Sequence, residues 1–356
     1  MTKCRVLVVE DSLTIRKRLC EIVAGHPDLE LVGEAEDGRQ AIELCAALRP
    51  DVVSLDMQMP VMSGLAATEY IMAHVPTPIL IVSASTNRAE LFKTYEALAA
   101  GAVDVLEKPR GDEFDTDWDG RFISTLKLVA KIKVITHPRG RLGSVGRPRA
   151  VTPADTLPTT PSGEIRLVAI GASTGGPAAI VEILRALPTL HVPLLLVMHI
   201  DEPFSAAFAD WLDGNTHHRV TYARDGEPLH GAAGRVVMAP PGAHLVVVGG
   251  RMQLLADAPR HSCRPSVDVL FESLARECRT SVLACLLTGM GRDGAAGLLA
   301  IRRAGGFTIA QDEATSVVYG MPREAVQLGA AVRVLPLGDI GAFLGHMLKA
   351  TGRTPQ

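Results

Sequence analysis

The feature that most constrains this fold is an alternation of short apolar runs with helix-period stretches, which occurs in both halves of the 356-residue chain. In the first half the apolar runs lie at 5–9, 29–35, 52–55, 78–82 and 104–106. Helical patterns lie between and after them at 12–24, 38–48, 63–74, 88–100 and about 121–135. Strands that alternate with helices in this way are typical of a parallel sheet covered on both faces. We therefore predict a flavodoxin-like (βα)5 unit.

The same alternation resumes after residue 163. Apolar runs lie at 165–170, 193–198, 235–239, 281–287 and 308–310, and helical patterns at 178–187, 267–278 and 295–304. Two further apolar runs, 245–248 and 252–255, flank Gly249-Gly250, which is typical of a hairpin turn. The sequence thus predicts a second, Rossmann-like α/β unit, doubly wound and mostly parallel, with a small antiparallel edge.

Proline, glycine and arginine dominate residues 137–163, where almost nothing is apolar. Such a segment cannot bury a core, so we predict an extended, mobile linker. A basic arm for nucleic acid is the alternative, but a few spaced charges in a Pro/Gly segment usually serve solvation. The predicted organisation is a first domain at 3–122, an extended helix and linker at 123–162, and a second domain at 163–350.

Composition excludes several functional classes. The net charge is −3 and aromatic residues make up only 4% of the chain, so a nucleic-acid surface or a base-stacking platform is not expected. No apolar run approaches the ~20 residues that span a bilayer, and the N-terminal run is too short for a signal-peptide core. The cysteines form no Cys-x-x-Cys pair, which favours reduced and mostly buried thiols. We expect a cytoplasmic protein that is not inserted in the membrane.

The strand ends of the first domain carry a chemically consistent set of residues: Glu10, Asp11, Asp56, Ser83 and Lys108. In a doubly wound sheet, ligands bind beyond the carboxyl ends of the strands. Clustered carboxylates favour Mg²⁺, and the metal can bridge to a phosphoryl group on Asp56 while Lys108 and Ser83 contact its oxygens. Each residue taken alone has a simpler interpretation, such as Asp11 as a helix cap.

These residues resemble the receiver domain of two-component systems. The resemblance covers about residues 3–122 and depends on Glu10-Asp11, Leu55-Asp56, Met59-Pro60-x-Met62-x-Gly64, Ser83-Ala84 and Lys108-Pro109. It implies phosphorylation of Asp56 by a histidine kinase, with Mg²⁺ as cofactor. Two positions depart from the pattern: Ser63-Gly64 replaces a frequent Asp-Gly, and Val105 replaces a common aromatic. The second departure means that the resemblance does not extend to an aromatic-rotamer switch.

In the second domain, a serine lies on a predicted strand-to-helix turn. Gly171 and Gly175 flank Ser173 as in Gly-x-Ser-x-Gly, a turn that exposes a nucleophilic hydroxyl, and Pro177 suits the first helical turn. A dinucleotide-binding turn is the alternative, but that motif needs different glycine spacing and usually an acid at the end of the next strand. Here the next strand ends in His199.

His199 and Asp293 complete a possible catalytic triad, because each follows another predicted strand. Taken alone, His199 could be a structural histidine and Asp293 a helix cap. Together with Ser173 they provide nucleophile, base and orienting acid. Their order along the chain differs from that of the α/β-hydrolases. Activity should then fall on the acid side of a pKa in the ordinary histidine range, ~5.5–7.5.

The surrounding residues resemble the chemoreceptor glutamate methylesterase family over about residues 163–350. The matching segments are 170–177, 264–268, 287–295, 310–313 and 316–323. The resemblance implies a cytoplasmic enzyme that hydrolyses glutamyl methyl esters on chemoreceptor helices, releases methanol, deamidates glutamine and needs no cofactor. Met290 and Thr174 are expected to support the oxyanion. The run Met198-His199-Ile200-Asp201 departs from the family's Gln-His-Met-Pro, so a donor beside the base is expected to be lost.

Two alternatives remain open at this point. The same enzyme could serve a signalling array that does not control motility. A receiver-controlled binding module with an inactive triad is the other possibility, and an assay of methanol release distinguishes a binder from an enzyme.

Overall fold

The computed structural model describes residues 3–84, 87–109, 116–132, 134, 163–200, 202–205 and 207–351. The chain divides into two compact units, Met1–Arg147 and Pro148–Gln356, which are described separately below. Most of the predicted linker, and Asp201, lie outside the described residues. Within the described ranges, no helix combines the length and the apolar character needed to cross a membrane.

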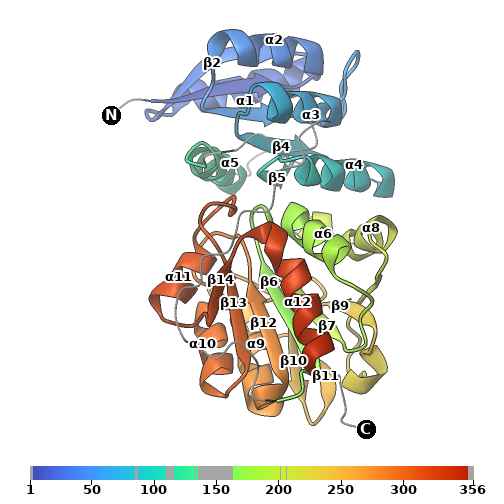
Figure 1. Ribbon diagram of the computed structural model, residues 1–356. Helices are drawn as coiled ribbons and strands as arrows, with labels where there is room; N and C mark the ends of the chain where they lie inside the picture. Colours follow the sequence, from blue (N-terminus) through green and yellow to red (C-terminus); the bar gives the residue numbers. More distant parts are fainter. Residues whose placement is uncertain are drawn as a thin grey trace. The chain divides into compact units, whose positions relative to one another are not determined.

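The first unit is a five-stranded parallel sheet in the order β2-β1-β3-β4-β5, flanked by helices (Figure 1). Its strands are β1 Cys4–Val9, β2 Leu29–Ala35, β3 Val52–Leu55, β4 Ile79–Ser83 and β5 Asp104–Glu107. Its helices are α1 Leu13–Gly25, α2 Gly38–Leu48, α3 Gly64–His74, α4 Arg88–Ala99 and α5 Thr116–Val129. This strand order is that of the flavodoxin-like fold, so the predicted architecture is confirmed.

Only the last helix of this unit differs clearly from its predicted bounds. The sequence predicted a helix over about 121–135, whereas α5 begins at Thr116 and ends at Val129. The buried side chains Trp118, Phe122 and Leu126 recur every four residues and define one face of the helix. The rings of Trp118 and Phe122 stack with centroids 5.1 Å apart. The face that the sheet buries therefore starts before the predicted helix.

The second unit contains a seven-stranded, entirely parallel sheet in the order β14-β13-β12-β6-β7-β9-β8. Its strands are β6 Leu167–Ala172, β7 Leu194–Met198, β8 Arg219–Tyr222, β9 Arg235–Met238, β12 Val282–Leu286, β13 Phe307–Gln311 and β14 Arg333–Leu335. Its helices are α6 Gly176–Ala186, α7 Glu202–Ser205, α8 Phe208–Asn215, α9 Val267–Glu277, α10 Ala295–Arg303, α11 Met321–Gln327 and α12 Leu337–Thr351. The sequence analysis did not identify β8, β14, α7, α8, α11 or α12, most of which are short.

The predicted hairpin is present, and it forms its own two-stranded antiparallel sheet. The strands β10 His244–Val248 and β11 Arg251–Leu255 pair across Gly249 and Gly250, which both have left-handed φ angles. The hairpin is attached to α9, where the hydroxyl of Ser273 accepts a hydrogen bond from the N–H of Val247 at 3.0 Å. The antiparallel pair therefore lies beside the main sheet and is not one of its edge strands.

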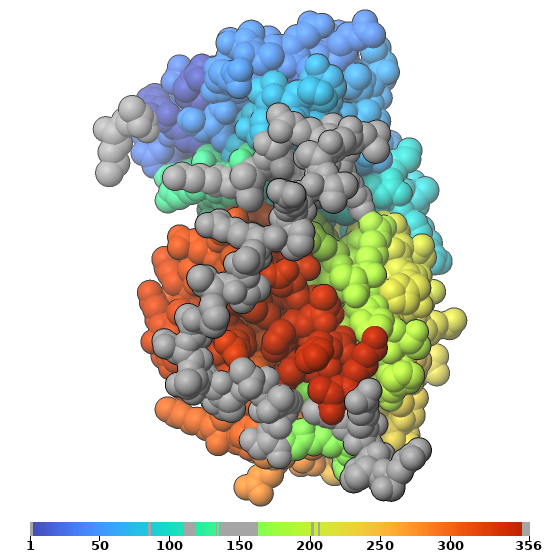
Figure 2. All heavy atoms as spheres, in the orientation of Figure 1, coloured from blue at the N-terminus to red at the C-terminus, as the bar shows by residue number. Residues whose placement is uncertain are grey.

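Residues of the central strand β6 pack against the helices α9 and α10 on one side of the sheet. Leu167 and Ala169 belong to the core that also contains Phe271 of α9 and Leu298 of α10. On another part of the sheet, α6 and α12 pack closely: a Cβ on Gly341 of α12 would lie 2.8 Å from the carbonyl oxygen of α6's Ile183 (Figure 1). The outer side of α12, in red, forms a strip of the surface in Figure 2. The second unit therefore has helices on both faces of a buried sheet.

A substitution at Gly175 can show how strongly close packing constrains the turn at the end of β6. It caps α6 with a φ angle of 77°, and a Cβ there would lie 2.5 Å from the Cβ of Val317. Gly175→Ala should therefore destabilise the catalytic unit by about 1–3 kcal/mol. Gly214→Ala in α8, where nothing lies within 4 Å of the added Cβ, should be neutral or slightly stabilising.

Urea unfolding checks this prediction. The fluorescence of Trp211, recorded in a Trp118→Phe background, reports on the catalytic unit alone. Equal midpoints for the two glycine variants would contradict the expected difference.

Candidate functional sites

The strand order brings Ser173, His199 and Asp293 to one edge of the seven-stranded sheet. Ser173 follows β6, and the two neighbours of β6 in the sheet are β7, which His199 follows, and β12, which leads to Asp293. The chain runs outward from β6 to β7 on one side and returns to β12 on the other. Such a switch point is where doubly wound sheets bind ligands.

The turn that carries Ser173 is fixed by its backbone. The N–H of Ser173 donates to the carbonyl of Thr288 at 3.0 Å, and its own carbonyl accepts from the N–H of Gly176 at 2.6 Å. The side chain is half-buried at the N-terminal end of α6. Within the described ranges the Ser173 hydroxyl makes no hydrogen bond, so it is not yet paired with the base.

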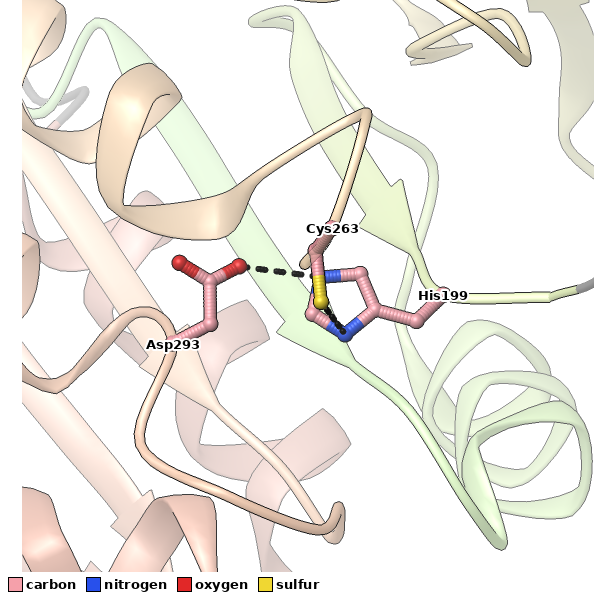
Figure 3. A group of neighbouring side chains, drawn as sticks. All are labelled: His199, Cys263 and Asp293. Carbon is pink, nitrogen blue, oxygen red and sulfur yellow. Dashed lines mark hydrogen bonds and ion pairs between the residues drawn. The ribbon is translucent and has the colours of Figure 1, made fainter. Parts of the chain in front are cut away.

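His199 is held beside this turn by its N–H, which donates to the carbonyl of Ala172 at 3.0 Å. Its Nε2 lies 2.9 Å from Oδ2 of Asp293, and its Nδ1 lies 3.6 Å from Sγ of Cys263 (Figure 3). The ring is 13% exposed. Because Nε2 faces the carboxylate, Nδ1 is the nitrogen left to accept a proton.

Asp293 is bound by the N-terminus of α9, not by the helix that follows it in sequence. Its Oδ1 accepts from the Ser266 hydroxyl at 2.7 Å and from the N–H of Asp268 at 3.1 Å. Its Oδ2 accepts from the N–H of Val267 at 2.7 Å. The following helix, α10, is capped by Gly294 instead. The helix-cap interpretation is thus wrong for α10, and the carboxylate is held by another helix.

These contacts set the charges of the pair. Burial alone would raise the pKa of Asp293, but His199, Ser266 and the Val267 N–H outweigh it, and the pKa falls below its usual value. Burial alone would lower the pKa of His199, but the contacts with Asp293 and Cys263 raise it to about 9. The pair is therefore an imidazolium–carboxylate ion pair at neutral pH.

A second network connects the serine turn to the loop after β12. The hydroxyl of Thr288 donates to the carbonyl of Thr174 at 3.0 Å, and the N–H of Thr288 donates to Oε1 of Gln311 at 2.8 Å. A Cβ on Gly289 would lie 2.7 Å from the Cβ of Ser173, so this loop passes directly beside the serine. Met290, the next residue, is 53% exposed. The predicted support residues Thr174 and Met290 therefore lie near the nucleophile.

A cavity of about 240 Å³ lies among the loops that carry His199 and Cys263, although neither residue is part of its lining. Its lining includes Met198 and Ile200, which flank His199 in sequence, together with Ser262 and Arg264, which flank Cys263.

The strand ends of the first unit also converge. Nζ of Lys108 lies 2.9 Å from Oε2 of Glu10 and 2.9 Å from Oδ2 of Asp56, and both carboxylates are buried. Asp11, which is exposed, is close enough for oxygens of all three acids to lie within 4.8 Å of one another. Asp11 does not cap α1, whose N-cap is Ser12.

Charge in this second site is unbalanced. Burial, followed by repulsion from Asp56, raises the pKa of Glu10 to about 7. Burial also raises the pKa of Asp56, although Lys108 opposes the shift. Burial alone would lower the pKa of Lys108, but the two carboxylates raise it. Two buried carboxylates thus share one ammonium, and an additional cation suits the site.

Ser83 lies at the end of β4, where it is buried. Its carbonyl accepts from the N–H of Lys108 at 3.0 Å, which places the two residues side by side. Its hydroxyl makes no hydrogen bond within the described ranges. Val105, at the position of the common aromatic, is buried in β5.

Sequence reasoning missed three features of the catalytic site. Ser266 and the N-terminus of α9 bind Asp293, and Gln311 fixes Thr288. The third is Cys263: the cysteines were expected to be mostly buried, yet only Cys45 and Cys285 are, and Cys263 lies against the base. The segment 264–268 was noted as a motif, but nothing in it signalled a contact with Asp293.

Comparison with known proteins matches residues 6–114 to the response regulator receiver domain and residues 168–344 to CheB methylesterase. The folds and sites thus define a response regulator with a hydrolase-type output domain. Protein-glutamate methylesterase/protein-glutamine glutaminase 2 of Anaeromyxobacter dehalogenans is 45% identical over 97% of both chains. Protein-glutamate methylesterase/protein-glutamine glutaminase 4 of Myxococcus xanthus is 43% identical over 98% of both chains. The chain belongs to this methylesterase/glutaminase family.

A solved structure gives a further comparison. The Thermotoga maritima CheB methylesterase catalytic domain is 34% identical, with a TM-score of 0.49, and the match covers 52% of this chain and 99% of that one.

The pKa of His199 predicts the pH dependence of hydrolysis. With a pKa of about 9, the imidazole is largely protonated at pH 7, so kcat/KM should rise with pH, reach half its maximum near pH 9 and level off above it. This acid limb lies above the range of ~5.5–7.5 expected from sequence alone, because Asp293 stabilises the imidazolium. In Asp293→Asn the limb should move to lower pH, at a much lower rate.

The measurement is kcat/KM against pH, corrected for spontaneous ester hydrolysis. A wild-type limb below pH 7 would show that the ion pair does not control the base.

Proposed function

We propose that this chain is a phosphorylation-regulated protein-glutamate methylesterase and protein-glutamine glutaminase of chemoreceptors, with Ser173 as nucleophile, His199 as base and Asp293 as orienting acid. The observation that supports this most directly is the imidazole of His199, which is ion-paired through Nε2 with a buried carboxylate, while the backbone of His199 is bonded to Ala172, the residue before Ser173. The catalytic domain spans 163–350.

In the first half of the reaction, Nδ1 of His199 takes the hydroxyl proton of Ser173 as Oγ attacks the ester carbonyl. The developing oxyanion is stabilised by backbone N–H groups near Met290, with Thr174 holding the turn. The imidazolium then returns its proton to the departing methoxide, and methanol leaves. Asp293 keeps the ring in one orientation throughout.

In the second half, water attacks the acyl-enzyme, with His199 again acting as base. A glutamine side chain follows the same route, with ammonia as the protonated leaving group. The substrate is the cytoplasmic helices of methyl-accepting chemoreceptors, so the enzyme acts in the cytoplasm.

The receiver spans residues 3–122 and accepts a phosphoryl group on Asp56 from a histidine kinase. Glu10, Asp11 and Asp56 would hold Mg²⁺: their carboxylate oxygens lie within 4.8 Å of one another, the buried pair Glu10 and Asp56 shares the single ammonium of Lys108, and oxygen ligands are those Mg²⁺ prefers. Bound Mg²⁺ supplies positive charge to offset the phosphoryl oxygens. Lys108 and Ser83 contact the other oxygens.

The receiver controls the esterase through the segment 123–162. Unphosphorylated, it covers the cleft at Ser173 and inhibits. Phosphorylation adds roughly −1.5 to −2 charge at Asp56, draws the hydroxyl of Ser83 toward the phosphoryl group and shifts the loop after β4. A change from 1:99 to 99:1 in the open state needs ~5.5 kcal/mol, and partial activation needs far less.

The triad is tested by single substitutions. Ser173→Ala, His199→Ala and Asp293→Ala should each reduce methanol release from methylated receptor membranes by about three orders of magnitude or more while remaining folded. Ser281→Ala is a matched control, because this half-buried serine precedes β12 at the opposite edge of the same sheet. Circular dichroism reports the fold. Substantial hydrolysis by folded Ser173→Ala would refute the mechanism.

Regulation is tested separately. Deleting residues 1–140 should raise basal activity above that of the unphosphorylated full chain. Asp56→Asn should stay at the basal rate with a small-molecule phosphodonor and Mg²⁺, whereas Asp51→Asn should still respond, because Asp51 is exposed at the other end of β3. If the truncated enzyme is no faster and the phosphodonor changes nothing, the receiver does not act by occlusion.

A further inference from the structure

Cys263, His199 and Asp293 form a row of neighbouring reactive groups with the proposed catalytic base in the middle. Its Sγ lies 3.6 Å from Nδ1 of His199, whose Nε2 lies 2.9 Å from Asp293 (Figure 3). Since Nε2 faces the carboxylate, Nδ1 is the ring nitrogen that faces the thiol, and the imidazolium can donate its Nδ1 proton to the sulfur. Cysteine reacts through its thiolate, and nucleophilic cysteines in proteins are commonly paired with a histidine. Cys263 is thus placed like a nucleophile although the hydrolysis mechanism does not use it.

The position of Cys263 is fixed by the hydrogen bonds of the turn that carries it. Arg260 and Cys263 exchange two backbone hydrogen bonds, at 3.0 and 2.9 Å, around a two-residue turn. Both turn residues, His261 and Ser262, have left-handed φ angles of 52° and 63°. The guanidinium of Arg260 makes two hydrogen bonds of 2.7 Å with Glu272 of α9. The turn is therefore anchored to the helix that also holds Asp293.

The other cysteines lie in unreactive surroundings. Burial raises the pKa of Cys4 and Cys20 to about 11 and that of Cys45 to about 12. Burial also raises the pKa of Cys278 and Cys285. In addition, Cys263 is only partly buried, and its sequence neighbours Ser262 and Arg264 line a cavity of the same unit. Reaction at the thiols should therefore be selective for Cys263.

We propose that Cys263 is a modification site through which peroxides and other thiol-directed electrophiles stop the hydrolase; the inhibitory part rests on the proposed function. With a peroxide, the thiol proton passes to solvent, the sulfur of the thiolate attacks one oxygen, and the O–O bond breaks. The products are a sulfenic acid and, once the imidazolium of His199 gives its Nδ1 proton to the departing oxygen, water or an alcohol. Sulfur is oxidised by two electrons and the peroxide is reduced by two. The added group then occupies the space at Nδ1, which must accept the proton of Ser173.

The experiment uses the full-length protein and iodoacetamide, in which an S–C bond forms and iodide leaves. Mass spectrometry of peptides gives the labelling rate at each cysteine. Cys263 should react at least about tenfold faster than each of the other five. Loss of methanol release, expressed relative to each untreated protein, should follow labelling of Cys263. Cys263→Ser and Cys263→Ala should lose no further activity on treatment, whereas Cys278→Ser should be as sensitive as the wild type.

Labelling also tests the role of the base without an activity assay. His199→Gln should slow labelling of Cys263 by about tenfold or more and leave Cys278 unchanged, because only Cys263 faces the imidazole. Hydrogen peroxide should inhibit the wild type, and a thiol reductant should restore it, since sulfenic acid is reversible.

Two results would overturn the proposal. One is labelling of Cys263 no faster than that of Cys278, and the other is full activity in protein labelled at Cys263. If the untreated wild type releases no methanol, the proposed function fails, and neither variants nor treatments can change the activity. The labelling rates then still decide whether Cys263 is the reactive thiol.

Discussion

The catalytic geometry depends on the buried charge of Asp293. Burying a carboxylate without partners costs several kcal/mol, and here the N-terminus of α9 offsets that cost through Ser266 and two backbone N–H groups. Hydrogen bonds to charged groups contribute about 1.5–3 kcal/mol each, and the helix terminus favours negative charge. Because this charge is permanent, His199 is ion-paired through Nε2, and Nδ1 is the ring nitrogen that remains for proton transfer. The nucleophile has a base only because another helix holds the acid.

The sequence predicts the main residues of both sites because parallel strands end at a common edge. Ser173, His199, Asp56 and Lys108 each follow an apolar run, so their position at that edge follows from the strand pattern. The contacts of Asp293 with Ser266 could not be predicted in the same way, since they join loops whose paths no periodicity fixes. Sequence also does not predict which ring nitrogen of His199 faces the acid, and hence the pKa of the base, because both depend on the three-dimensional positions of the side chains.

The two sites use the same topology and opposite charge balances. In the catalytic unit one carboxylate pairs with one imidazole, so the charge is satisfied within the site. In the receiver, Glu10 and Asp56 share the single ammonium of Lys108, and burial raises the pKa of both acids. The receiver site therefore holds excess buried negative charge until it gains a cation, and its charge changes on phosphorylation. A catalytic site that is already balanced is better controlled by covering it than by altering its electrostatics.

The contact between Cys263 and His199 is compatible with catalysis for a simple reason. Nδ1 makes one hydrogen bond at a time, and a thiol is a weak hydrogen-bond partner. The hydroxyl of Ser173 can therefore displace the thiol when a substrate aligns it, at little cost. A sulfur that carries an added oxygen or alkyl group is larger, and the turn anchored by Arg260 prevents it from moving away. The same rigidity that keeps the unmodified thiol harmless would make a modified one an obstruction.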